Sequence, residues 1–217
     1  MPPFPLISVH VAKAGGTSVA HMLKEAYGEG FFSTYRDNPA DPLSQRVLDP
    51  CKYFSRREKM PIGINCVHGH FHPGKFDLTQ DLVLFTLLRH PVDNILSIYF
   101  YWNTLKDRSD GLHDYFCHNN LTIMETAQLP LLRWLYSRTY FENFDMRRFD
   151  VIGRHEDREN ILKKLSERIE TPLNIFAREN LTPESQERRE ALEDRALRNQ
   201  LENLLVEDIR FYERHTR

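Results

Sequence analysis

The sequence has few cysteines, little net charge and no long hydrophobic run. Its three cysteines are an odd number with no CxxC pair, which argues against a disulfide framework and a thiolate zinc site. The 29 Lys and Arg against 31 Asp and Glu leave a net charge of -2, so no overall positive field recruits nucleic acid or an anionic membrane. No stretch approaches the roughly 18 apolar residues of a membrane-spanning helix. We therefore expect no nucleic-acid partner and no transmembrane segment, and only a local site for any anionic ligand.

Compartment and domain number follow from equally simple features. The N-terminal segment MPPFPLISVHVAK has early prolines and no basic region ahead of its short apolar run, so we expect it to be neither a secretory signal nor a membrane anchor. Unpaired Cys51, Cys66 and Cys117 favour a reducing compartment, and we expect a cytoplasmic protein. A chain of 217 residues suits one domain over residues 1–217. The oligomeric state is not predicted.

Short apolar runs alternate with segments of helical periodicity along the chain. Strands are expected at 6–11, 64–69, 81–88 and 149–153, and an irregular segment with one short helix at 28–61. This alternation predicts a three-layer α/β domain with a mostly parallel central sheet flanked by helices, in which ligands bind beyond the carboxyl ends of the strands. Helices are expected at 18–27, from Pro91, from a capping box at Thr122 with a break at Pro130, at 156–169, and as one long or broken helix from Thr182 and Pro183 to the C-terminus.

The segment 10–18, HVAKAGGTS, joins the first expected strand to the first expected helix. Gly15 and Gly16 allow a sharp turn that points several N–H groups at one place, at a helix N-terminus whose dipole favours an anion. Lys13 adds a positive charge, and two hydroxyl side chains follow the glycines. Alone, the loop fits a phosphate or sulfate site and a Gly-Gly turn beside a surface lysine equally well. An ATP-binding Walker loop places its lysine after the last glycine, whereas Lys13 precedes both.

Two further groups of residues are candidates for binding and chemistry. Arg89 follows the strand 81–88, and Ser97 lies two turns into the next helix, so both can converge on one anion such as a phosphomonoester. An arginine that pairs with a carboxylate, beside an ordinary helix serine, explains them as well. Of the four aromatic residues at 99–102, only one or two can face a ligand, because consecutive helical residues point in all directions.

Histidines alternate at positions 68, 70 and 72. On extended chain such side chains project to one side, which suits a two-histidine metal site, but no third ligand at a recognisable spacing accompanies them, and no metal is expected. A structural role, or simple exposure, is an alternative for each. Histidine is also the side chain whose ordinary pKa lies nearest neutrality, and it serves as a general base with the least perturbation.

In this order and spacing, these segments resemble the motifs of sulfotransferases that use 3′-phosphoadenosine 5′-phosphosulfate (PAPS). The loop resembles the HIPKTAGTS form of the carbohydrate branch that includes heparan sulfate 2-O-sulfotransferases, the segment from Arg89 resembles RDPxxRxxSxYYY, and the HGH string resembles HGHxxxxxF. The segments 149–165 and 204–215 resemble the family's late strand-helix and closing helix. The departures are Val11-Ala12 for Ile-Pro, Ala14 for Thr, Gly15 for Ala, His90 for Asp and Asn94 for Arg.

The resemblance implies a P-loop-like fold, PAPS as donor with adenosine 3′,5′-bisphosphate as product, and a hydroxyl acceptor, with a carbohydrate as first choice. It implies that His70 is the catalytic base, that His68 orients the acceptor, and that Lys13 stabilises charge on the leaving phosphate oxygen without a metal. By the same resemblance, the residues that hold the nucleotide are Lys13, Ala14, Gly15, Gly16, Thr17, Ser18, Arg89 and Ser97.

Two other functions stay open. A P-loop kinase or NTPase shares the strand-loop-helix opening, but its lysine order differs, and no clear magnesium carboxylate follows a strand, with Asp81 at the start of one as the nearest candidate. A non-catalytic nucleotide-binding protein of the same fold is the second. The acceptor surface is expected from the irregular segments 28–61 and 103–121.

Overall fold

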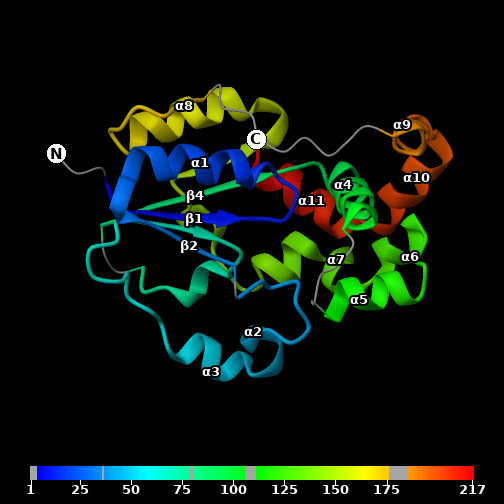
Figure 1. Ribbon diagram of the computed structural model, residues 1–217, viewed down its shortest axis with the longest axis horizontal. Helices are drawn as coiled ribbons and strands as arrows, with labels where there is room; N and C mark the ends of the chain where they lie inside the picture. Colours follow the sequence, from blue (N-terminus) through cyan, green and yellow to red (C-terminus); the bar gives the residue numbers. More distant parts are fainter. Residues whose placement is uncertain (1–3, 36, 79–80, 106–110, 176–184) are drawn as a thin grey trace.

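The computed structural model describes residues 4–35, 37–78, 81–105, 111–175 and 185–217. Its centre is a five-stranded sheet of order β2-β3-β1-β4-β5, in which every neighbouring pair is parallel (Figure 1). The expected α/β class with a mostly parallel central sheet is confirmed. The strands are β1 Leu6–His10, β2 Phe31–Thr34, β3 Cys66–Gly69, β4 Val83–Leu88 and β5 Val151–Arg154.

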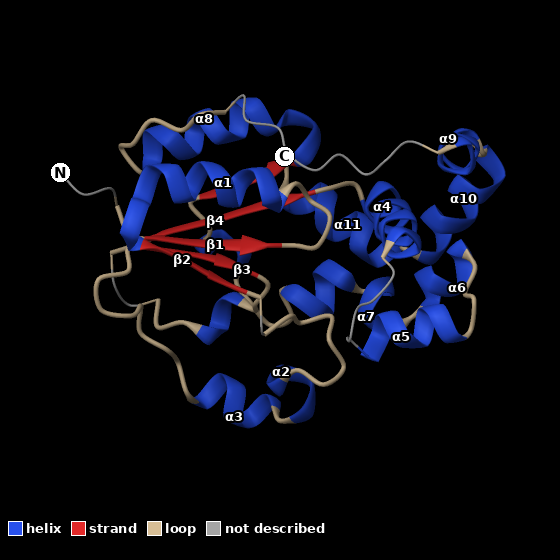
Figure 2. Cartoon of the chain, in the orientation of Figure 1, coloured by secondary structure: helices blue, strands red, loops and turns tan. Residues whose placement is uncertain are grey.

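Helices cover both faces of this sheet (Figure 2). One face carries α1 (Gly16–Tyr27) and α8 (Arg158–Arg168). The opposite face carries α4 (Pro91–Thr104) and most of the remaining helices. None of the helices in the described ranges combines the length and apolarity that crossing a bilayer requires. The other helices are α2 Gln45–Leu48, α3 Pro50–Ser55, α5 Gly111–His118, α6 Ile123–Gln128, α7 Pro130–Arg133, the π-helix η3 Leu135–Tyr140, α9 Gln186–Glu193, α10 Arg195–Leu204, α11 Val206–His215, and the 3-10 turns η1 Gly28–Gly30, η2 Pro73–Lys75, η4 Met146–Arg148 and η5 His155–Asp157.

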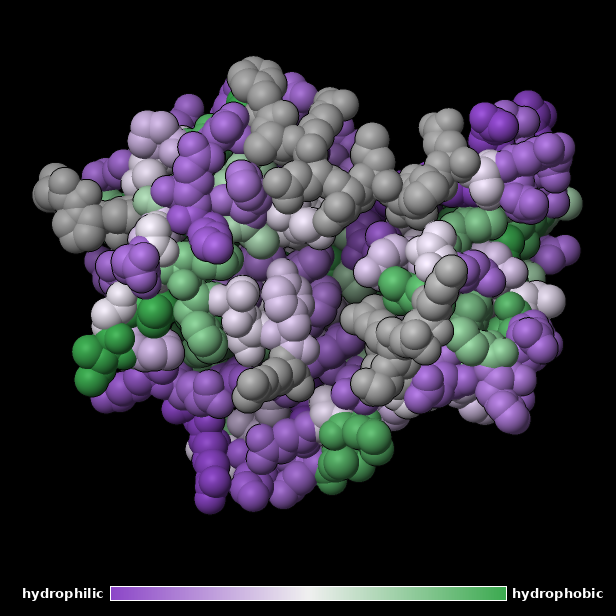
Figure 3. Space-filling model, in the orientation of Figure 1, coloured by the Kyte–Doolittle hydropathy of each residue, from purple (hydrophilic) through white to green (hydrophobic). Residues whose placement is uncertain are grey.

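Strand side chains alternate between two hydrophobic cores. Leu6 and Phe85 pack with α1 and α8, whereas Ile7 and Leu84 pack with the helices of the opposite face. Because a strand covered on both faces needs apolar side chains on both, the central strands read as continuous apolar runs. That is why these strands could be predicted from the sequence. The molecular surface in Figure 3 is mostly hydrophilic, with small separate apolar patches.

The structure corrects the expected elements where burial is weak. Residues 28–61, expected to be irregular with one short helix, contain β2, α2 and α3. As an edge strand, β2 has no buried apolar run, and Phe32 is 45% exposed. The capping box at Thr122 and the break at Pro130 are confirmed.

The C-terminal segment folds as three helices. Thr182 and Pro183, the expected start, lie outside the described residues. The carboxylate of Asp194 accepts hydrogen bonds from the backbone N–H groups of Ala196 and Leu197, at 2.8 and 3.0 Å, and so begins α10 just after α9 ends. Of the two alternatives, one long helix or a broken one, the broken helix is confirmed for residues 186–215.

We expect Gly153→Ala to destabilise the fold, because a Cβ at this position of β5 would lie 2.2 Å from Cγ1 of Ile161 on α8. Overpacking of this kind costs about 1–3 kcal/mol of the free energy of unfolding. In an Ile161→Ala background the same change should cost much less, since the clashing atoms are gone. Urea denaturation of the four proteins measures this coupling, and equal costs in both backgrounds would contradict the packing described.

Candidate active site

Each of the five strands delivers a polar side chain to the same edge of the sheet. His10 ends β1, Tyr35 follows β2, His70 follows β3, Arg89 follows β4 and His155 follows β5. The His10 and His70 rings stack at 4.4 Å between centroids, and the Tyr35 ring lies edge-on to His70 at 4.9 Å. The carboxyl edge of the sheet is therefore the candidate site, as expected for a fold of this class.

The loop between β1 and α1 has the backbone of an anion site. Lys13 and Gly15 adopt left-handed conformations, with φ of 61° and 85°, and no side chain caps the N-terminus of α1. The first turn of α1 contains no acidic residue, so its N–H groups and dipole favour a negative ligand. A Cβ at Gly16 would lie 1.9 Å from Nε2 of His10, so only glycine fits there. Of the other loop residues, Thr17 is exposed, and Ala14 and Ser18 are buried.

Two contacts from α4 hold this loop. The side-chain amide of Asn94 donates a 2.9 Å hydrogen bond to the carbonyl of Ala12, and the ammonium of Lys13 lies 3.7 Å from the centre of the Tyr101 ring. Tyr101 is thus the member of the aromatic run that meets the loop, whereas Trp102 is buried in the core. The resembled motif has an arginine where this chain has Asn94. The uncharged amide of Asn94 holds the loop backbone through its hydrogen bond to Ala12.

His70 is held in one tautomer. Its Nδ1 lies 2.6 Å from the backbone carbonyl of His10 and 3.0 Å from the hydroxyl of Tyr140. A carbonyl oxygen only accepts hydrogen bonds, so Nδ1 carries the proton and the ring's lone pair is on Nε2. This is the tautomer in which the more distant nitrogen can accept a proton, as a general base must.

His68 and His10 form a buried, uncharged support beneath His70. His68 Nδ1 lies 2.8 Å from the hydroxyl of Ser8, and its ring stacks on His10 at 5.2 Å. Burial, followed by the nearby His70, lowers the pKa of His68 to about 3, and burial holds the pKa of His10 well below its usual value. Both rings are therefore neutral at neutral pH. Sequence reasoning did not select His10, although it directly precedes the loop.

His72 does not share this cluster. Its Nδ1 accepts a 2.9 Å hydrogen bond from the N–H of Gly74, and its Nε2 donates at 2.9 Å to the carbonyl of Glu142. The expectation of histidines on one side holds for His68 and His70, which both contact His10, and is wrong for His72, because its side chain caps the 3-10 turn η2 instead. In the described ranges no three His, Cys, Asp or Glu side chains are placed to hold a metal ion.

The backbone of Arg89 is clamped from the opposite core. The Tyr136 hydroxyl donates a 2.6 Å hydrogen bond to the Arg89 carbonyl and accepts one from its N–H at 3.3 Å. Tyr136 is held in turn by buried Asp208, whose carboxylate accepts hydrogen bonds from the N–H of Tyr136 at 2.8 Å and from the hydroxyl of Ser137 at 2.6 Å. Burial raises the pKa of Asp208 to about 6. The clamp fixes where the Arg89 side chain leaves the strand.

The Arg89 guanidinium forms no hydrogen bond or ion pair with any residue the structure describes. Burial lowers its pKa, and its charge adds to burial in lowering the pKa of His155. His155 also lies against the loop, since a Cβ at Gly15 would be 2.9 Å from its ring. Ser97 is 3% exposed on α4, and none of the described hydrogen bonds joins it to Arg89. His155 was missed from the sequence, where its place after a strand was the one available signal.

Comparison with known proteins adds little to this geometry. No protein-family model matches the sequence. No curated protein matches it either. The structure is similar to that of a sulfotransferase from Alicyclobacillus acidocaldarius, at 14% sequence identity and a TM-score of 0.46, over 93% of this chain and 95% of that one. We draw nothing about activity from a likeness at that level.

We expect acid to destabilise the protein through its buried histidines. Burial lowers the pKa of His72 to about 4 from its ordinary 6.5, so the folded state binds fewer protons than the unfolded chain between these values. The contribution of His72 to the free energy of unfolding has its full value above pH 6.5. Below that pH it falls by about 1.4 kcal/mol per pH unit until the folded-state pKa is reached. His72→Gln should reduce the slope of unfolding free energy against pH by that amount.

Urea denaturation at pH 7, 6 and 5 measures the slope, and His118→Gln, an exposed histidine on α5, serves as the matched control. A slope that His72→Gln leaves unchanged would contradict the buried neutral state of this ring.

Proposed function

We propose that this protein is a sulfotransferase that moves the sulfuryl group of PAPS to a hydroxyl acceptor. One observation carries the proposal: adjacent strands β3, β1 and β4 bring His70, the glycine loop and Arg89 to one edge of the sheet. A proton acceptor and two separate anion-binding features in this order suit a donor with two anionic groups and an acceptor that must lose a proton.

The residues present fit such a nucleotide. The uncapped N-terminus of α1, with Lys13 beside it, supplies N–H donors and a positive charge for the 5′-phosphosulfate. Arg89, clamped by Tyr136, supplies a guanidinium for the 3′-phosphate, with Ser97 as the further donor carried over from the resemblance. Gly16 allows the backbone to approach closely because it has no side chain.

When bound, PAPS supplies the sulfuryl group. His70 accepts the proton of the acceptor hydroxyl on Nε2, and the His10 carbonyl stabilises the imidazolium because it already receives a hydrogen bond from Nδ1. Lys13 and the loop N–H groups stabilise the negative charge that develops on the leaving phosphate oxygen. Neutral His68 is buried beneath His10, where it supports the base without a competing positive charge, and the acceptor-orienting role that the resemblance implies for it stays a prediction.

A P-loop kinase or NTPase is less well supported. Its magnesium would need a carboxylate near the loop, but Asp81 precedes β4 and so lies toward the amino end of that strand, away from the carboxyl edge. The proposal includes a carbohydrate as acceptor and a cytoplasmic location, the latter supported by three free cysteines.

We expect adenosine 3′,5′-bisphosphate to bind far more tightly than 5′-AMP, because the proposal assigns Arg89 to the 3′-phosphate, a group that 5′-AMP lacks. Arg89→Ala should weaken adenosine 3′,5′-bisphosphate by about 1.5–3 kcal/mol, the range for hydrogen bonds to a charged group, and leave 5′-AMP nearly unchanged. Isothermal titration of both nucleotides measures this difference.

Arg147→Ala is the control, since that side chain is 89% exposed and pairs with Asp145 away from the carboxyl edge. Equal affinity of the wild-type protein for the two nucleotides would remove the assignment of Arg89.

His70→Ala should lose about 10²–10⁴-fold in the rate of sulfuryl transfer while it keeps its fold and its nucleotide affinity. The wild-type rate should fall at acid pH, because a protonated imidazole cannot accept a proton. Transfer of radiolabelled sulfate from PAPS to an acceptor measures the rate. A well-folded His70→Ala protein with wild-type turnover would exclude the base mechanism.

A further inference from the structure

His155 leaves the sheet next to Arg89. In the parallel pair β4 and β5, Leu88 is the register partner of Arg154, so the residues that follow them, Arg89 and His155, come off neighbouring strands at the same level. Neighbouring strands are about 4.8 Å apart. The guanidinium and the imidazole therefore start from adjacent points on the carboxyl edge of the sheet.

Both side chains belong to the face of the sheet that carries α1. Leu87 of β4 and Val151 of β5 pack in the core beneath α1 and α8. Residues an even number of positions further along an extended chain point to the same face, which places residues 89 and 155 there. The packing of His155 agrees, because a Cβ at Gly15, just before α1, would lie 2.9 Å from Cδ2 and 3.1 Å from Nε2 of its ring. His155 therefore lies beside both the loop and Arg89.

The ring of His155 has unused hydrogen-bonding capacity. No hydrogen bond to this ring is present in the part of the chain that the structure describes. Neither of its nitrogens is among the buried atoms that lack a partner, so a ligand can reach them. His72 is different, because both of its ring nitrogens are engaged by the backbone. The surroundings of His155 are those of a binding residue that awaits its acceptor.

The charges around His155 keep its ring neutral. Burial lowers its pKa most, and the charge of Arg89 lowers it further; Glu156 opposes this and Arg158 of α8 adds to it. The Glu156 carboxylate already accepts a 3.0 Å hydrogen bond from the hydroxyl of Tyr212. The loop contributes the charge of Lys13, whose ammonium lies over the Tyr101 ring of α4.

A phosphate bound beside Arg89 would reverse this balance. A phosphomonoester carries a charge of about -1.5 to -2 at pH 7 and three acceptor oxygens. A negative charge of that size offsets the effect of Arg89 on the ring and favours the imidazolium, which donates a strong, charge-assisted hydrogen bond. We propose that His155 binds the 3′-phosphate of the nucleotide together with Arg89 and takes up a proton from solvent when it does so. This inference rests on the proposed function and adds a second cation to its nucleotide site.

NMR titration of the full chain measures the protonation of His155 directly. The Cε1–H signal of this ring is the one that is missing from the spectrum of His155→Gln. Saturation with adenosine 3′,5′-bisphosphate should raise the pKa of His155 by about one unit or more, whereas 5′-AMP should leave it nearly unchanged. A pKa that adenosine 3′,5′-bisphosphate does not move would overturn the proposal. An equal rise with both nucleotides would overturn the assignment to the 3′-phosphate.

Nucleotide affinity gives a second measurement. Because binding takes up a proton, the affinity of the wild-type protein for adenosine 3′,5′-bisphosphate should fall as the pH rises from 6 to 8, by up to about tenfold per pH unit more than that of His155→Gln. The phosphate itself titrates near pH 6 in both proteins, so the difference between them is the quantity that reports on His155. Affinity for 5′-AMP should be the same in both, which shows that the loop is intact in the variant.

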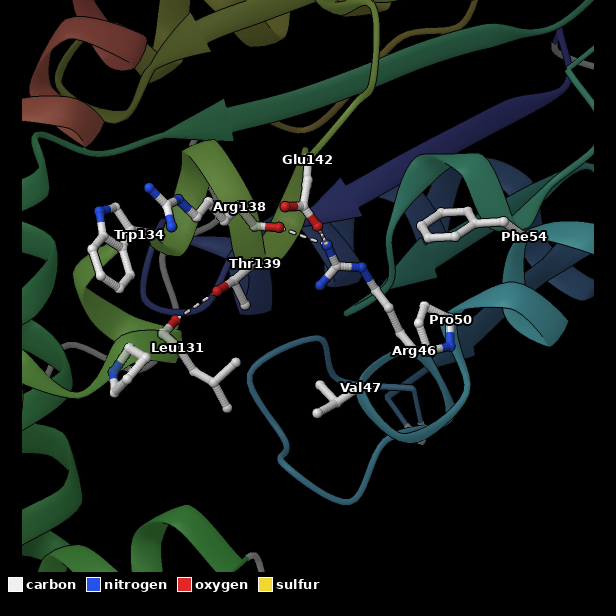
Figure 4. Close-up of a pocket in the computed structure, with 10 residues that line it drawn as sticks. Arg46, Val47, Pro50, Phe54, Leu131, Trp134, Arg138, Thr139 and Glu142 are labelled. Carbon is white, nitrogen blue, oxygen red and sulfur yellow. Dashed lines mark hydrogen bonds and ion pairs between the residues drawn. The ribbon is translucent and has the colours of Figure 1, made fainter.

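Two control variants should keep the wild-type dependence on pH. His118→Gln changes an exposed histidine of α5. Arg138→Gln changes the wall of a cavity of about 370 Å³ that includes two arginines, Arg46 and Arg138, and is lined by α2, α3, α7 and η3 and not by the loop, Arg89 or His155 (Figure 4). Loss of the pH dependence in Arg138→Gln would move the phosphate to that cavity and overturn the proposal.

The outcomes separate this inference from the proposed function. A normal preference for adenosine 3′,5′-bisphosphate over 5′-AMP, with a pH dependence that His155→Gln does not change, would overturn the role of His155 alone. Loss of that preference in the wild-type protein would overturn the sulfotransferase proposal. The two histidines are also distinguishable, because a lower pH should slow transfer through His70 and tighten nucleotide binding through His155.

Discussion

All five strands of the sheet run in one direction, and the site depends on that constraint. Each crossover returns the chain to the amino edge, so every strand ends at the same carboxyl edge and delivers its next residue there. Residues between positions 10 and 155 are brought together in this way without any local motif that joins them. The hydrogen bond from His70 to the His10 carbonyl is one product of this arrangement, since β1 and β3 are adjacent.

The fold could be predicted where burial dictates composition. Strands β1, β3 and β4 are central, and their apolar runs are visible in the sequence, whereas the edge strand β5 has a shorter run that begins at buried Val151. The edge strand β2 could not be predicted, because its half-exposed side chains carry no such pattern. The breaks between the C-terminal helices depend on single capping residues such as Asp194, which interrupt an amphipathic periodicity that otherwise continues.

For the site, the sequence identifies the residues that carry charge or a titratable ring, and the structure identifies what positions them. Lys13, His70 and Arg89 stand in recognisable segments and reach one edge. The residues that position them do not stand in recognisable segments. Tyr136 and Asp208 are 72 residues apart in sequence, and the hydrogen bond between the Tyr136 N–H and the Asp208 carboxylate leaves no pattern in it. The turn of His72 away from its neighbours depends on where a strand ends, which alternation alone does not define.

The contact between Gly16 and the ring of His10 makes the loop after β1 and the histidine cluster one packed unit. Any side chain introduced at position 16 must displace the His10 ring, which stacks on the ring of His70. Positions 10 and 16 are therefore expected to be an epistatic pair, in which a side chain at position 16 needs a smaller residue at position 10. Under the proposed function, changes in donor choice and in acceptor activation are therefore coupled through this one contact.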